Sequence, residues 1–307
     1  MSGAGNRVVV QADRHLEHQV QRLAGLRMVF FAGLPGTGKS LLVHQLAHVA
    51  ARAGRSIHLL QWDVARPAFE ACPAGQRYPL AAGVTHSLIR KAAGLWAREA
   101  IAAWNERHSD QRQLLVGETP FVGNRFVELA HRVDDEAEHT LSAPSCRFVI
   151  AVPSVEVRRF LEALRERRAV NPLHPRERED APPHVLRDLW RELAEVAPRM
   201  SIPVQAPVTG AGTAADAGSG PGHDSGVPYD PAVYRRVYER VLRHRHVETI
   251  ALDTILPTEH LSVYDFAHAP SDLAPTTAEA EDAIREAERR YPTPAAVERE
   301  TAFWWSV

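Results

Sequence analysis

The chain has 307 residues, of which 45% are hydrophobic and 24% charged, and its formal net charge at pH 7 is −2. This composition is typical of a globular protein with one sizeable core, and the small net charge argues against a long nucleic-acid track or an anionic membrane as the main partner. Cys72 and Cys146 are too few for a disulfide framework, and no stretch approaches about 18 consecutive apolar residues, so we expect a cytoplasmic protein that does not span a membrane.

The first strong signal in chain order is a P-loop pattern between a strand and a helix. Residues 27–32 are typical of a short buried strand, and apolar residues recur at helical spacing after residue 40. The backbone of such a loop surrounds nucleotide phosphates, its lysine reaches the same oxygens, and its final hydroxyl binds Mg²⁺. We therefore predict an ATP site with catalytic Lys39 and with Ser40 as a magnesium ligand. The spacing G-x-x-x-x-G-K-[ST] is made by Gly33, Leu34, Pro35, Gly36, Thr37, Gly38, Lys39 and Ser40.

A second strand is predicted over residues 56–61, and Asp63 and Arg66 follow its carboxyl end. In doubly wound sheets, ligands bind beyond the carboxyl ends of the strands, so both side chains are candidates for chemistry. The structural alternative is that Asp63 caps a helix and Arg66 is its surface partner.

A long helix is expected from about residue 85 to 107, followed by a third strand that ends in Glu118. We expect Glu118 to bind Mg²⁺ or a substrate hydroxyl. Asn124 and Arg125 would begin a helix whose apolar face runs from residue 126 to 133, at the active edge of the sheet. The acidic residues 134–136 follow that helix and are interpreted as a solvated turn.

An arginine-rich segment follows the fourth strand, which is predicted over residues 146–152. Ser154 is the expected N-cap of its first helix. The arginines between residues 158 and 178 form either a mobile lid or a solvated helix face, and within a lid we favour Arg165 and Arg168 as substrate or phosphate ligands.

Residues 201–226 are rich in Gly, Ala, Pro, Ser and Thr and are expected to be a flexible insertion. A fifth strand is predicted over residues 247–252. Residues 1–257 would form one domain around the P-loop, which the resemblance described below makes kinase-like, and residues 258–307 a helical tail packed on it. The fold class is therefore α/β, a P-loop NTPase with a parallel five-stranded sheet flanked by helices.

The arrangement resembles the P-loop kinases, in particular the polynucleotide-kinase and zeta-toxin-like group. The matching pieces are residues 33–40, the Asp63-x-x-Arg66 pair, Glu118 and the arginine-bearing segment after the fourth strand. The resemblance implies that Asp63 accepts the proton of the attacking hydroxyl and that Arg66 contacts the substrate or a phosphate. It also implies a lid whose arginines close on the phosphates, with ATP and Mg²⁺ as cofactors.

These features favour an ATP-dependent phosphotransferase that moves the γ-phosphate to a hydroxyl of a small molecule or nucleotide. A 5′-hydroxyl polynucleotide kinase, acting on a nucleic-acid end, is the alternative enzyme. A regulatory nucleotide-binding ATPase is the alternative from another class, but it would have no need of the Asp63-x-x-Arg66 pair. The residues leave the acceptor and the oligomeric state open.

Overall fold

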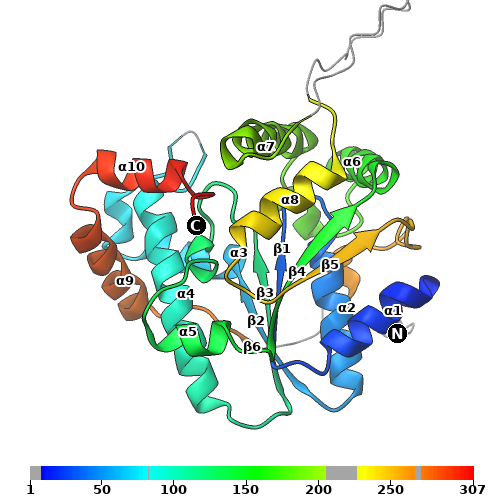
Figure 1. Ribbon diagram of the computed structural model, residues 1–307, viewed down its shortest axis with the longest axis horizontal. Helices are drawn as coiled ribbons and strands as arrows, with labels where there is room; N and C mark the ends of the chain where they lie inside the picture. The colour runs from blue at the N-terminus through cyan, green and yellow to red at the C-terminus, as the bar shows by residue number, and fades with distance from the viewer. Residues whose placement is uncertain (1–7, 82, 205–226, 267–270) are drawn as a thin grey trace, which may run out of the picture.

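The computed structural model describes residues 8–81, 83–204, 227–266 and 271–307. Its centre is one sheet of parallel strands in the order β5-β4-β1-β3-β2-β6 (Figure 1). The predicted α/β class with a parallel sheet flanked by helices is confirmed. The strands are β1 (Met28–Ala32), β2 (Ser56–Gln61), β3 (Gln113–Thr119), β4 (Cys146–Pro153), β5 (Val247–Leu252) and β6 (Ser271–Asp272).

The predicted number of five strands is wrong, because β6 adds a sixth at the edge beside β2. This strand has only two residues, both of them polar and exposed. It therefore lacks the alternation of apolar and polar residues by which a strand is recognised in a sequence.

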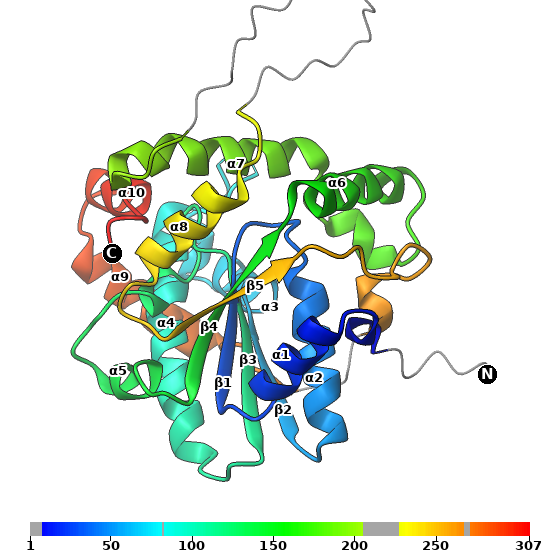
Figure 2. The ribbon, with the colours of Figure 1, turned by 45° about the vertical axis from the view of Figure 1, so that its right-hand side comes forward.

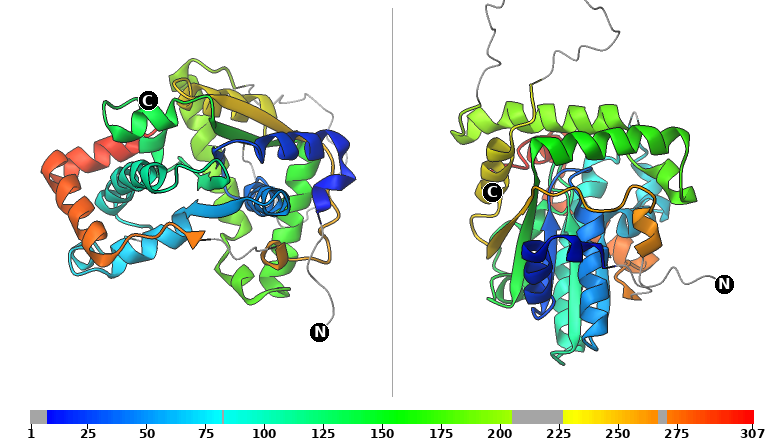
Figure 3. Two further views of the ribbon diagram at one scale, coloured as in Figure 1. Left: turned by 90° about the horizontal axis from the view of Figure 1, so that it is seen from below. Right: turned by 90° about the vertical axis from the view of Figure 1, so that its right-hand side faces the viewer.

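Helices cover both faces of the sheet, as Figures 1 and 3 show. Helices α1 and α2 lie on one face, and α4 lies on the other. Each face of the sheet has its own hydrophobic core, and strand β1 contributes to both. Val29 and Phe31 are buried on the α1–α2 side, while Phe30 is buried on the α4 side. The helices are α1 (Arg14–Leu23), α2 (Lys39–Arg52), α3 (Trp62–Ala71), α4 (Ser87–Arg107), α5 (Glu136–Leu141), α6 (Val155–Val170), α7 (Pro183–Val196), α8 (Pro231–Val241), α9 (Thr277–Arg290) and α10 (Pro294–Ala302).

Local side-chain bonds fix several helix starts where the sequence predicts them. The Ser154 hydroxyl accepts a hydrogen bond from the Val157 N–H and caps α6, as expected. At α9, Thr276 and Glu279 form a reciprocal capping box. These caps satisfy N–H groups that have no partner within the helix itself.

The helix predicted over residues 126–133 is wrong. Only a 3₁₀ turn, η3 (Val127–Leu129), forms there, because Phe126 has a left-handed backbone with φ 61° that an α-helix cannot contain. The following acidic residues 134–136 are exposed, and 134 and 135 form a bend, in agreement with the predicted solvated turn, but they also have a structural role. Asp135 caps α5 and forms an ion pair with Arg98 of α4, with Nε and Oδ2 2.6 Å apart.

Part of the predicted flexible insertion also belongs to the fold. Ile202 is buried in the core on the α4 side of the sheet. The rest of that prediction, residues 205–226, lies outside the described residues. In the C-terminal tail, α9 and α10 pack against α4, and Trp304 is buried in the same core. No helix in the described ranges has both the length and the apolar character needed to cross a bilayer.

Helices α6 and α7 lie across the carboxyl ends of the strands (Figures 2 and 3). The chain leaves β1 toward β2 and leaves the neighbouring β4 toward β5, on the opposite side. In open α/β sheets such a switch point is where ligands bind, beyond the carboxyl ends of the strands. The loop after β1 stands at this position.

Candidate functional site

The loop after β1 turns tightly into helix α2. Gly36 and Gly38 have φ of 72° and 85°, values that residues with a side chain rarely adopt, and Gly38 is the N-cap of α2. Lys39 is the first residue of the helix and is buried. Its Nζ donates a hydrogen bond to the Leu34 carbonyl at 2.7 Å and lies 3.4 Å from Oε1 of Glu118. The loop therefore joins a helix N-terminus, which favours anions, to a buried ammonium group.

The two predicted magnesium ligands are neighbours. Glu118 stands near the end of β3, paired in register with Phe31 of β1 and Gln61 of β2. The Ser40 hydroxyl donates a hydrogen bond to Oε2 of Glu118 at 3.3 Å. A hydroxyl and a carboxylate fit Mg²⁺, which takes oxygen ligands and binds proteins through one or two carboxylates together with substrate phosphates and water. In the described part of the chain, no group of three or more His, Cys, Asp or Glu residues could hold a metal ion.

Asp63 lies in the first turn of α3, immediately after β2. The helix cap is Gln61 rather than Asp63, and Arg66 forms its ion pair with Glu70 at 2.7 Å. The capping half of the structural alternative is therefore wrong, whereas the charge of Arg66 still acts on Asp63 even though its ion pair is with Glu70.

The environment of Asp63 makes it a better proton acceptor. Burial, followed by the negative charge of Glu118, raises the pKa of Asp63 above its usual value of 3.8, while Arg66, Arg125 and Lys39 oppose that rise. A helix N-terminus alone would lower the pKa of a carboxylate. A carboxylate whose pKa is raised by burial and by a like charge is the type of group that general-base chemistry uses.

Asn124 and Arg125 occupy a strained loop between β3 and η3. Phe121, Asn124 and Phe126 all have φ of 60–61°, which is uncommon for residues with a side chain. Asn124 is only 1% exposed, and neither its Oδ1 nor its Nδ2 has a hydrogen-bond partner among the described residues. Strain of this kind costs about 1–3 kcal/mol per residue and clusters at functional sites.

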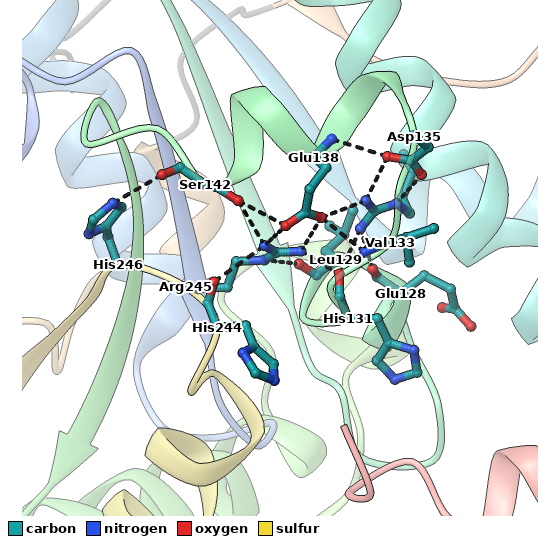
Figure 4. Close-up of polar contacts among 11 residues, drawn as sticks. Glu128, Leu129, His131, Val133, Asp135, Glu138, Ser142, His244, Arg245 and His246 are labelled. Atoms are coloured by element: carbon teal, nitrogen blue, oxygen red, sulfur yellow. Dashed lines mark hydrogen bonds and ion pairs between the residues drawn. The ribbon is translucent and has the colours of Figure 1, made fainter.

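A buried ionic network holds the segment after this loop in place. Arg98 of α4 donates to the carbonyl of Glu128 at 2.7 Å, and Arg245 donates to the carbonyl of Leu129 at 2.8 Å. Figure 4 shows Arg245 and Glu138 facing each other, and their ion pair is 2.7 Å long. The network fixes the backbone a few residues beyond Arg125.

The arginines favoured in the lid do not contact the loop after β1. Arg165 pairs with Asp180 at 3.1 Å, and Arg168 pairs with Glu177 at 3.1 Å. These two arginines therefore join α6 to the segment after it rather than to the loop after β1.

A different arginine reaches the loop after β1. Arg158 of α6 donates to the carbonyls of Pro35 and Gly36, both at 3.3 Å, and its side chain is only 3% exposed. It also donates to the carbonyl of Leu186 in α7 at 3.3 Å. The sequence places Arg158 in the arginine run, but nothing in the spacing distinguishes it from the others.

Helices α7 and α8 also pack against the loop after β1. A Cβ atom added at Gly36 would lie 2.7 Å from Cδ1 of Leu186, so α7 packs directly on this glycine. The Leu34 N–H donates to the hydroxyl of Tyr234 in α8 at 3.2 Å. The sequence indicates Tyr234 only as part of a buried helix face, and its polar contact depends on tertiary packing.

A cavity of about 290 Å³, lined in part by Arg158, lies between α6, α7 and the segment before α8. Its wall combines the rings of Trp190 and Tyr229 with four arginines and one glutamate. The guanidinium of Arg158 lies 5.6 Å from the centre of the Tyr229 ring. The lining residues are Val155, Arg158, Arg159, Glu162, Arg187, Trp190, Arg191, Val227, Pro228 and Tyr229.

Comparisons with protein-family models, with curated proteins and with solved structures found no match to this chain.

Proposed function

We propose that this chain is an ATP-dependent phosphotransferase of the P-loop NTPase fold, which moves the γ-phosphate of ATP to a hydroxyl of a small molecule or nucleotide. The observation that supports the proposal is that Lys39, Ser40 and Asp63 all interact with Glu118. Lys39 and Ser40 contact its two carboxylate oxygens, and its charge raises the pKa of Asp63. A phosphate cradle, a candidate magnesium site and a candidate base thus share one edge of the sheet.

In the proposed reaction, the acceptor oxygen attacks the γ-phosphorus while the bond from that phosphorus to the β–γ bridging oxygen breaks. Asp63 takes the proton of the acceptor hydroxyl, and the bond electrons leave with ADP. Lys39 offsets the charge on the phosphate oxygens, and Arg66 contacts the acceptor or a phosphate. Phosphoryl transfer depends mainly on such positioning and charge stabilisation, so few protein groups are needed.

Ser40 and Glu118 would hold Mg²⁺, which supplies positive charge to the phosphates when it is bound. We place the protein in the cytoplasm, where ATP is available and thiols remain reduced. Both cysteines are free and buried, as such a compartment allows.

The cavity beside Arg158 supports one second candidate, a 5′-hydroxyl polynucleotide kinase. Arginines combined with aromatic rings are the groups that hold single-stranded nucleic acid, by charge and by base stacking. Trp190 and Tyr229 pack edge to face here with centroids 5.0 Å apart, and because Trp190 is buried, Tyr229 is the ring that a base could reach. A 5′-hydroxyl oligonucleotide therefore belongs among the acceptors tested.

The test is transfer of a radiolabelled γ-phosphate to nucleosides, sugars, antibiotics and 5′-hydroxyl oligonucleotides, with wild type and Lys39→Ala compared. We expect a labelled product with wild type only. Lys39→Ala should keep a native circular dichroism spectrum but lose transfer, because its charge acts on the phosphates. Release of labelled inorganic phosphate with no labelled acceptor would favour the regulatory ATPase. Transfer that survives in Lys39→Ala would show that this loop is not the phosphate site.

A further inference from the structure

Arg90 and Arg125 are neighbouring cations, and the charge of Arg125 acts on Asp63. Burial lowers the pKa of Arg125, which interacts with the charges of Asp63, Glu192 and Arg66. Burial also lowers the pKa of Arg90, and the positive charge of Arg125 adds to that effect. The negative charge of Glu192 acts on both guanidinium groups, but among the described residues neither of them forms an ion pair of 4.0 Å or less with a carboxylate. Most of their N–H donors are therefore available to a ligand.

The polar groups around this pair are fixed and only partly satisfied. Arg90 donates to the carbonyl of Gly123 in the strained loop, yet its Nε is buried without a partner. The adjacent Asn124 is buried with both polar atoms unpartnered, again among the described residues. Buried polar atoms nearly always have partners in native proteins, so several unpartnered ones at one place indicate a binding site. Chemically, the missing partner of a guanidinium is an anion.

Asp63 links this pair to the phosphate loop. It interacts electrostatically with Lys39 and with Arg125. The charges acting on Lys39 are those of Glu118, Asp63 and Arg158. The charge of Arg125 therefore acts on the candidate base, and that of Arg158 acts on the lysine of the loop.

We infer that Arg125 and Arg90, with Asn124, form a subsite for an anionic group of the acceptor, a phosphate or a carboxylate, which the acceptor carries in addition to its reacting hydroxyl. The inference rests on the proposed function. An acceptor held at its anionic end by the arginines would present its hydroxyl to Asp63. Uncharged hydroxyl compounds should be poor acceptors by comparison.

Equilibrium dialysis of radiolabelled inorganic phosphate tests this subsite without any transfer. The protein is first saturated with Mg²⁺ and a non-hydrolysable ATP analogue, so that the phosphate loop is filled. Wild type should bind phosphate, and Arg125→Met should raise the Kd by roughly 10- to 100-fold because it removes a charge-assisted, bidentate donor. Arg125→Lys should recover part of that loss. Competition by acetate then distinguishes a subsite that accepts carboxylates from one that selects phosphate.

Arg107→Met is the matched control, because Arg107 is exposed in the last turn of α4 and roughly 26 Å along that helix from Arg90. It should leave phosphate binding unchanged. Arg90→Gln is the second variant if Arg125→Met does not fold, and it should also raise the Kd. No phosphate binding by wild type, or equal binding by wild type and the site variants, would overturn the subsite. Analogue binding without phosphate binding would refute only the subsite, whereas failure to bind the analogue would refute the proposed function.

Discussion

Replacing Arg158 should weaken ATP binding more than replacing any other lid arginine discussed above. Its guanidinium lies 3.3 Å from the carbonyls of Pro35 and Gly36, so it stands within one peptide unit of the N–H groups that would bind phosphate. At an effective dielectric constant of about 20 and a separation of roughly 7 Å, two unit charges interact by about 2 kcal/mol, which corresponds to a change in Kd of about 30-fold. Arg158 is also paired with Glu162 at 2.6 Å, which offsets part of its charge, so Arg158→Met should raise the Kd for ATP by up to about that factor.

The assay is isothermal titration of wild type, Arg158→Met and Arg165→Met with Mg²⁺ and a non-hydrolysable ATP analogue. Arg165→Met is the matched control, since Arg165 of the same helix also pairs with a carboxylate, that of Asp180, but makes no contact with the loop after β1. It should alter thermal stability slightly and leave the Kd unchanged. Arg158→Lys keeps the charge and should lose less affinity than Arg158→Met. Equal losses in Arg158→Met and Arg165→Met, or an unchanged Kd in Arg158→Met, would refute the assignment of Arg158 to the nucleotide.

Two further predictions concern pH and stability. Burial favours the protonated form of Glu138, but hydrogen bonds from Arg245 and Arg98 hold its pKa well below the usual 4.5. The contribution of Glu138 to stability is therefore present above pH 4.5 and is lost as the pH falls below that value. Glu138→Gln should cost about 3 kcal/mol in urea unfolding at pH 7 and flatten the pH dependence below pH 4.5, whereas a cost near zero would contradict a structural role for the network. Burial, with a smaller effect of the Arg176 charge, lowers the pKa of His44 from 6.5 to about 4. The contribution of the neutral His44 to stability is therefore present above pH 6.5 and is lost as the pH falls toward 4. The stability lost between pH 7 and pH 5 should be about 2 kcal/mol smaller in His44→Gln than in wild type, and an identical loss would show that His44 is accessible to protons in the folded state.

The parts of the site that local patterns encode could be predicted from the sequence. The loop of residues 33–40 is contiguous, and Glu118 follows from a strand end, because parallel strands bring their carboxyl ends to one edge. The contact between Ser40 and Glu118 agrees with that prediction. The parallel sheet itself follows from the alternation of apolar strand and helix patterns.

The remaining parts depend on tertiary contacts that spacing does not encode. Helix α6 carries several arginines, and its buried residues are Val157, Arg158 and Leu164, so the arginine that meets the loop shares the buried side with apolar residues. A run of charges shows only that some of them face solvent. The left-handed backbone of Asn124 and Phe126 could not be predicted either, since neither is glycine. That backbone replaced the predicted helix and shaped the loop that carries Arg125.

The most direct test of the proposed phosphotransferase is the rate of transfer by Asp63→Asn, measured at saturating ATP with the acceptor that the labelling screen identifies. Asparagine keeps the size of aspartate but cannot accept the hydroxyl proton, and a general base contributes about 10²- to 10⁴-fold in rate. Transfer should fall by roughly that factor while the Kd for ATP stays unchanged, because the loop of residues 33–40 is intact. Undiminished transfer by Asp63→Asn would contradict the role of Asp63 as the base and, with it, the proposed mechanism.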